Sequence, residues 1–152
     1  MTTHDIDIKL LRLEENRERT HLYRWEMMRY EATPVEVNLA TEFAYHAGKN
    51  IVRLTLSARY TTLRGQISRR LLDYAITADF EINGAESEQM PEEIVVTPDI
   101  VRLMLSIAVG AMRGMVALRT ERTFLANYPL PIYDMESLME PIMNASHEAV
   151  SA

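Results

Sequence analysis

The residue types that most often perform catalysis or bind metal ions are few and scattered in this sequence. The histidines, His4, His21, His46 and His147, include no pair at the four-residue spacing of a zinc-binding helix. Cysteine is absent, so no thiolate can serve as a nucleophile or a metal ligand. The serines and glycines form neither a nucleophile turn nor a phosphate-binding loop. We therefore predict no catalytic centre, no metal site and no cofactor.

Length and composition indicate a single globular domain. The 152 residues are 47% hydrophobic and 25% charged, which is ordinary globular usage. We therefore expect one domain over residues 1–152, with residues 144–152 as a flexible tail. The net charge of -6 disfavours nucleic acid and anionic membrane surfaces as partners. The most apolar stretch, residues 103–112, is shorter than the roughly 20 residues that span a bilayer, and no signal peptide is evident, so a cytoplasmic location is expected.

Alternating apolar and polar residues predict a β-sheet in the middle of the chain. Three segments show a period of two, which is typical of strands with one buried face: residues 35–46, 52–60 and 71–82. The short connections between them predict antiparallel hairpins. In the third segment, Leu71 and Asp73 are expected on the outward face. The N-terminal segment alternates less regularly, with a phase slip at Leu10–Leu11, and predicts one long strand or two, interrupted by a bulge or a turn.

A long apolar helix is predicted to follow an acidic loop. Thr97 can cap its N-terminus, and Pro98 suits the first helical position. Apolar residues lie on nearly all sides of this helix, so the side that does not pack on the sheet should meet another subunit. The chain also carries 10 methionines, a residue that fills cores and also forms adaptable binding surfaces. Both uses of methionine remain open.

Small residues recur at four-residue spacing along this helix. Ser106, Gly110 and Gly114 form a strip where a second backbone could approach closely, which makes them candidates for an oligomer interface. The alternative is that the glycines only allow the helix to seat on its own sheet. Glycine inside a helix costs about 1 kcal/mol relative to alanine, so a packing gain is expected from one of the two arrangements.

The segment after the helix is apolar but interrupted by prolines. Residues 124–133 include Pro129 and Pro131 and therefore predict neither a helix nor a regular strand. An apolar extended segment should pack against another surface. Asp134 can cap a short last helix that carries Leu138 on its apolar side.

The order of these elements resembles the SecB family of protein-export chaperones. The resemblance covers roughly residues 35–139. It depends most on Arg113–Gly114 through Thr120, Thr123–Phe124, Leu130–Pro131–Ile132 and Leu138, and then on Leu71–Leu72–Asp73 leading into Phe80, Ile82, Asn83 and Gly84. None of these segments is a catalytic signature, so the resemblance points to a binding protein and not to an enzyme.

The resemblance implies an α+β fold with a four-stranded antiparallel sheet, and a long helix and a short C-terminal helix packed on one face. It also implies a homotetramer, built as a dimer of dimers, that acts as an ATP-independent holdase for unfolded or preprotein chains. By position, the client-binding groove would include Phe124, Tyr128, Leu130, Ile132 and Tyr133. Leu71 and Asp73 would correspond to the SecB patch that meets the SecA motor.

Some features of this chain depart from SecB, so other functions are kept open. The C-terminal tail, which helps SecB to dock SecA, is short here and carries only Glu148 as a charged residue. Some SecB-like proteins instead protect an antitoxin, and the sequence does not choose between such clients. A non-catalytic oligomeric adaptor is a further alternative. A small-molecule enzyme or carrier is another, although the sequence offers no constellation of residues for it.

Overall fold

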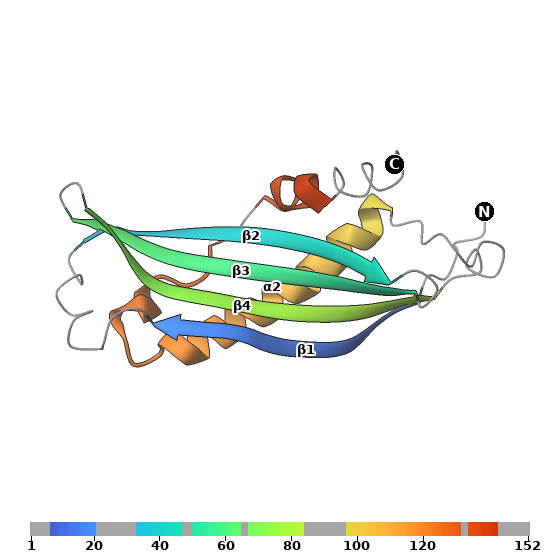
Figure 1. Ribbon diagram of the computed structural model, residues 1–152, viewed down its shortest axis with the longest axis horizontal. Coiled ribbons are helices and arrows are strands. Elements are labelled where there is room, and N and C mark those ends of the chain that lie inside the picture. Colours follow the sequence, from blue (N-terminus) through green and yellow to red (C-terminus); the bar gives the residue numbers. More distant parts are fainter. Residues whose placement is uncertain are drawn as a thin grey trace.

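The computed structural model is a four-stranded sheet with helices on one side (Figure 1). It describes residues 7–20, 33–46, 50–64, 67–83, 97–131 and 134–142. The elements are β1 (Asp7–Thr20), β2 (Val35–His46), β3 (Ile51–Arg64), β4 (Ile67–Asn83), α2 (Pro98–Thr120) and the 3-10 helix η3 (Phe124–Asn127), and residues 135–142 are also helical. The strand order is β1-β4-β3-β2, and all neighbours are antiparallel. The predicted α+β architecture is confirmed.

The core lies between the inner face of the sheet and α2. On β3 and β4, the apolar side chains of one alternating row are buried, as the sequence pattern predicts. These buried residues are Val52, Leu54, Leu56, Ala58, Tyr60, Leu72, Tyr74, Ile76, Ala78, Phe80 and Ile82. The corresponding side chains of β2 are only partly buried, because β2 is an edge strand.

Register shifts interrupt the alternation in two strands. The β3–β4 pairing shifts after Tyr60, so Leu71 has no direct partner and is fully buried beside Leu72. The prediction that Leu71 faces outward is wrong, because the extra residue of a bulge lets two successive side chains enter the core. In β1 the pairing with β4 shifts after Leu10 and after Glu15. Over residues 7–20 the N-terminal segment is therefore one strand with two irregularities, and the rest of the predicted segment, residues 21–27, lies outside the described residues.

Helix α2 crosses the sheet diagonally (Figure 1). It begins with Thr97 as its N-cap, whose side chain accepts a hydrogen bond from the backbone N–H of Ile100. It ends near β1, where Arg119 binds Glu15. By length and composition α2 could span a membrane. Nine of its residues are buried in the core, however, as in the core helix of a globular domain.

The proline-broken segment returns along α2 towards β2. Arg113 donates hydrogen bonds to the backbone carbonyls of Leu130 and Pro131, at 3.3 and 3.2 Å, which satisfies two groups that no regular element pairs. The final helical residues pack near β2, where the Thr41 hydroxyl donates to the carbonyl of Leu138 at 3.3 Å. Asp134 caps this last helix as predicted, accepting from the backbone N–H of Glu136.

Candidate interaction surfaces

One exposed side of α2 is continuous and uncharged. Between residues 103 and 118, every exposed position carries an uncharged side chain: Leu103, Ser106, Ile107, Gly110, Gly114, Ala117 and Leu118. Their spacing of three and four residues places them on one helical face, about 22 Å long at 1.5 Å per residue. Leu118 is 65% exposed and Leu103 is 47% exposed. We call this face the α2 outer strip; exposed apolar side chains gathered on one uncharged face are typical of an interaction site.

The two glycines of the strip make room for no other group of the described residues. A Cβ atom added at Gly110 or Gly114 would meet nothing within 4 Å. The alternative that these glycines allow α2 to seat on its own sheet is therefore wrong. Ser106, the third small residue, donates its hydroxyl only to the carbonyl of Arg102 in the same helix. If these small residues allow a close approach, the approaching group is not part of the described chain.

A second group of exposed apolar side chains lies on β1. Leu10, Leu11 and Leu13 are 41%, 42% and 37% exposed. Leu10 lies opposite Phe80 and Leu13 opposite Ala78, so both belong to the inner face of the sheet. This part of the inner face is uncovered because α2 reaches β1 only at the helix C-terminus (Figure 1). We call these residues the β1 leucine patch; the only sequence signal for it was the phase slip at Leu10–Leu11.

The residues predicted to form a client groove lie in different environments. Phe124 and Tyr128 make an edge-to-face contact, with ring centroids 6.3 Å apart, and both are partly buried against the core. Leu130 is 3% exposed and belongs to the core itself. Ile132 and Tyr133 lie outside the described residues. Of the three predicted groove residues that the structure describes, it therefore brings together the two aromatic rings.

Ion pairs dominate the opposite, open face of the sheet. Arg53 binds Asp79 through two hydrogen bonds, at 2.8 and 3.1 Å. Asp73 accepts from Arg59 at 3.0 Å and from Arg70 at 3.5 Å. Asp73 is only 8% exposed. It does face outward as predicted, but its charge is neutralised by two arginines, and its neighbour Leu71 is inside the core.

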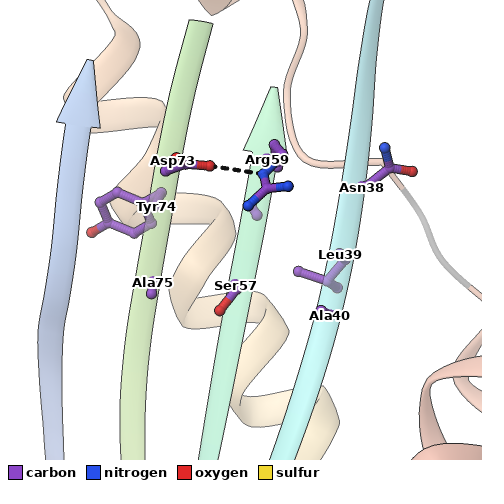
Figure 2. Close-up of a pocket in the computed structure, with 9 residues that line it drawn as sticks. Asn38, Leu39, Ala40, Ser57, Arg59, Asp73, Tyr74 and Ala75 are labelled. Carbon is purple, nitrogen blue, oxygen red and sulfur yellow. Dashed lines mark hydrogen bonds and ion pairs between the residues drawn. The ribbon is translucent and has the colours of Figure 1, made fainter. Parts of the chain in front are cut away.

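A shallow hollow of about 310 Å³ lies beside Asp73 on the open face (Figure 2). Ala40, Ser57 and Ala75 are aligned across three neighbouring strands, and their small side chains leave this space. Arg59 lies at one rim, with its guanidinium bound to Asp73. The hollow was not predicted, because each of its small residues is unremarkable by itself and only the strand register aligns them.

A polar cluster ties the end of α2 to the sheet. The Tyr74 hydroxyl donates to Glu15 at 3.0 Å, and Arg119 donates two hydrogen bonds to the same carboxylate oxygen at 3.1 and 3.0 Å. Burial, and then the interaction with Glu15, raises the pKa of Tyr74 well above its ordinary value. The cluster therefore joins β1, β4 and α2 through a tyrosine that stays protonated.

The raised pKa of Tyr74 predicts a loss of stability in alkali. In the unfolded chain Tyr74 ionises near its ordinary pKa of about 10, before it ionises in the folded protein. The contribution of Tyr74 to the free energy of unfolding is thus complete below pH 10. Above pH 10 this contribution falls, by up to about 1.4 kcal/mol per pH unit. We expect Tyr74→Phe to show a shallower decline than wild type in urea unfolding between pH 9 and 11. An equally steep decline of the free energy of unfolding in wild type and Tyr74→Phe would contradict the raised pKa of Tyr74.

The described residues offer no metal site. Among them, no three histidine, aspartate or glutamate side chains are grouped so that they could hold an ion. On the open face, Asp73 and Asp79 instead pair with arginines. The structure thus supplies two apolar surfaces on the helix side and an ion-paired face on the other.

Comparisons with known proteins find similarity only at the level of structure. No family model matches the sequence, and no curated protein matches it. A SecB-like chaperone from Mycobacterium tuberculosis (Rv1957), solved with a ChAD peptide from the HigA1 antitoxin, is 18% identical, with 86% of each chain covered and a TM-score of 0.49. A protein of unknown function from Streptococcus agalactiae is 10% identical, with 88% of this chain and 99% of that chain covered and a TM-score of 0.41.

Proposed function

We propose that this protein is an ATP-independent chaperone, a holdase that binds apolar segments of unfolded or preprotein chains. The observation that carries the proposal is the α2 outer strip, because its exposed leucine and isoleucine side chains contribute little to the chain's own core. Covering such a surface with apolar client groups yields about 25 cal/mol per Å² before the costs of ordering. Burial of the strip by a partner is therefore expected to be favourable in free energy.

The chemistry of the strip suits clients of varied sequence. None of its exposed residues is charged, and the half-buried Arg113 beside it is bound to the carbonyls of Leu130 and Pro131, so the strip imposes no charge pattern on a client. Its one exposed hydroxyl, on Ser106, already donates to its own helix. Apolar contact without directional hydrogen bonds discriminates weakly between sequences. The net charge of -6 would help to keep a loaded complex soluble.

The proposal includes a homotetramer, a dimer of dimers, located in the cytoplasm. In this tetramer, the small residues of the α2 outer strip, Ser106, Gly110 and Gly114, would face a second copy. The larger side chains of the strip, Leu103, Ile107 and Leu118, would remain for clients, and the β1 leucine patch would make the second kind of contact between copies. A role in Sec-dependent export would need a motor contact. Contact with SecA through Leu71 and Asp73 is not part of the proposal, since the first is buried and the second is paired with arginines.

The decisive experiment measures aggregation without nucleotide. A chemically unfolded substrate is diluted into buffer with a several-fold excess of the protein, and light scattering is followed. We expect wild type to suppress scattering and Ile107→Asp to lose most of this effect, because it places a charge within the strip. Ala126→Asp is the matched control, since Ala126 is exposed on η3, outside the strip. Circular dichroism and native mass establish that both variants are folded.

Two results would contradict the holdase. The first is that wild type forms its tetramer but does not suppress aggregation of the substrate. This result would favour a non-catalytic oligomeric adaptor, in which the strip serves only as a contact between copies. The other is equal protection by Ile107→Asp and wild type, which would place client binding elsewhere. Tyr128→Ser then tests the aromatic pair of the predicted groove. Protection of one substrate but not of unrelated ones would instead indicate a dedicated client, such as an antitoxin.

A further inference from the structure

Residues 129–131, in the proline-broken segment, are attached to the rest of the chain through one side chain. Proline has no N–H group, so Pro129 and Pro131 cannot donate a hydrogen bond to a neighbouring element. The carbonyls of Leu130 and Pro131 accept from Nε and Nη2 of Arg113, at 3.3 and 3.2 Å. Among the described residues, these two are the only hydrogen bonds that join residues 129–131 to another part of the chain.

The turn that precedes this segment is anchored independently. The N–H and the hydroxyl of Thr123 both donate to the carbonyl of Thr120, at 2.9 and 3.0 Å, and the Thr123 hydroxyl accepts from the N–H of Leu125 at 3.2 Å. The N–H of Tyr128 donates to the carbonyl of Leu125 at 2.9 Å. These bonds fix η3 to the end of α2 without Arg113. Loss of the Arg113 side chain is therefore expected to release residues 129–131 and to leave η3 in place.

The segment buries one large apolar side chain. Leu130 is 3% exposed and belongs to the core. Two residues before it, the Tyr128 ring is partly buried and contacts Phe124 edge to face. If the two carbonyl bonds break and residues 129–131 move outward, Leu130 leaves the core and its side chain joins the surface that already carries the two rings.

We propose that Arg113 is a clip that holds residues 129–131 closed over the core, and that its release lets Leu130 bind clients together with Phe124 and Tyr128. The clip is a property of the chain alone, whereas its use by clients rests on the proposed holdase function. Arg113 is a positioning residue in this scheme, because it acts on client binding through Leu130. The structure represents the closed form, and the fraction of open chains sets the apparent affinity for a client at this surface.

Thiol labelling measures the opening directly, because the chain has no cysteine of its own. Leu130→Cys places a single thiol in the core, where the thiol reagent DTNB reaches it only when the segment opens. Ala126→Cys, exposed on η3, gives the labelling rate of an open thiol. Leu125→Cys, at a position that is 1% exposed, is the matched buried control on η3. We expect Leu130→Cys to react roughly 100-fold more slowly than Ala126→Cys.

Removal of the clip should accelerate labelling at position 130 alone. Adding Arg113→Met to Leu130→Cys should raise the rate by about tenfold, because two hydrogen bonds from a charged donor are lost while most of the aliphatic stem is kept. The same change in Leu125→Cys should stay within about twofold. Arg113→Lys keeps the charge but not the planar fork, so it should raise the rate at position 130 by less than Arg113→Met does.

Two labelling results would overturn the clip. Equal acceleration at positions 125 and 130 would show a general loosening of the fold. No acceleration at position 130 would show that burial of Leu130 holds the segment without Arg113. Circular dichroism establishes that each variant is folded, and if Arg113→Met does not fold, Arg113→Lys decides between the same results.

The use of the open form by clients is tested separately, by light scattering. Arg113→Met should reach half-suppression of aggregation at about threefold lower protein concentration than wild type, because more chains are open. Adding Leu130→Ser should remove this gain. Faster labelling with an unchanged protein requirement would overturn the client role of Leu130. If wild type suppresses no aggregation, the holdase function fails, and the labelling rates still decide whether Arg113 is a clip.

Discussion

Replacing Leu105 with alanine is expected to lower the free energy of unfolding by about 2–5 kcal/mol. Leu105 is fully buried on the side of α2 that packs on the sheet. Truncation removes its transfer free energy and leaves a cavity between elements that hydrogen-bonded strands hold in place. Urea unfolding followed by circular dichroism measures the change in midpoint at constant slope.

The control lies two residues away on the same helix. Leu103 is 47% exposed, so Leu103→Ala should change the free energy of unfolding of the monomeric chain by no more than about 0.5 kcal/mol. The two substitutions remove the same atoms at opposite sides of α2. Equal losses in the monomer would mean that α2 is rotated relative to the structure, and the α2 outer strip would then not exist.

The central strands and α2 could be predicted because their signals are local. Alternation over β3 and β4 reports burial directly, since successive side chains point to opposite faces of a sheet. Thr97 and Pro98 mark the start of α2 by capping chemistry that needs no tertiary contact. Arg113 shows the limit of such reasoning: its bonds to the carbonyls of residues 130 and 131 depend on the path of a later segment.

The register shifts could not be predicted in the same way. A bulge adds one residue to one strand, and its cost or gain depends on the partner strand. This is why Leu71 was assigned to the wrong face, and why Leu11 was visible only as a break in a pattern. The exposure of Leu10 and Leu13 has another origin, which is the diagonal path of α2 across the sheet. This path is set by packing between α2 and the strands, and the local sequence of α2 or of β1 does not show it.

The candidate surfaces also differ in whether a local sequence signal indicates them. All-round apolarity of α2 indicated a side that its own sheet does not cover, and Gly110 and Gly114 lie on that side. The open-face hollow requires Ala40, Ser57 and Ala75 to be aligned, which only the pairing of three strands achieves. Leu130 failed as a surface residue because an apolar side chain in an extended segment can equally well enter the core.

Substitution of the strip glycines is expected to change stability and assembly in opposite directions. Because a Cβ atom at Gly110 or Gly114 meets nothing within 4 Å, alanine should raise the free energy of unfolding of the monomeric chain by about 0.5–1 kcal/mol at each site. In the proposed tetramer, a second copy lies close to these positions. Gly110→Leu should therefore weaken self-association by tenfold or more, or by about 1.4 kcal/mol.

Native mass and sedimentation over a range of concentrations measure the assembly, and urea unfolding at the lowest concentration measures the monomer. Ala126→Leu adds similar bulk at an exposed position outside the strip and should leave the assembly unchanged. An intact assembly in Gly110→Leu would contradict packing of a second copy on the strip. A destabilised monomer in Gly110→Ala would contradict the open space around this glycine. Since the helix propensity of alanine acts within one chain and steric exclusion acts between chains, the two measurements separate the fold of α2 from the use of its outer strip.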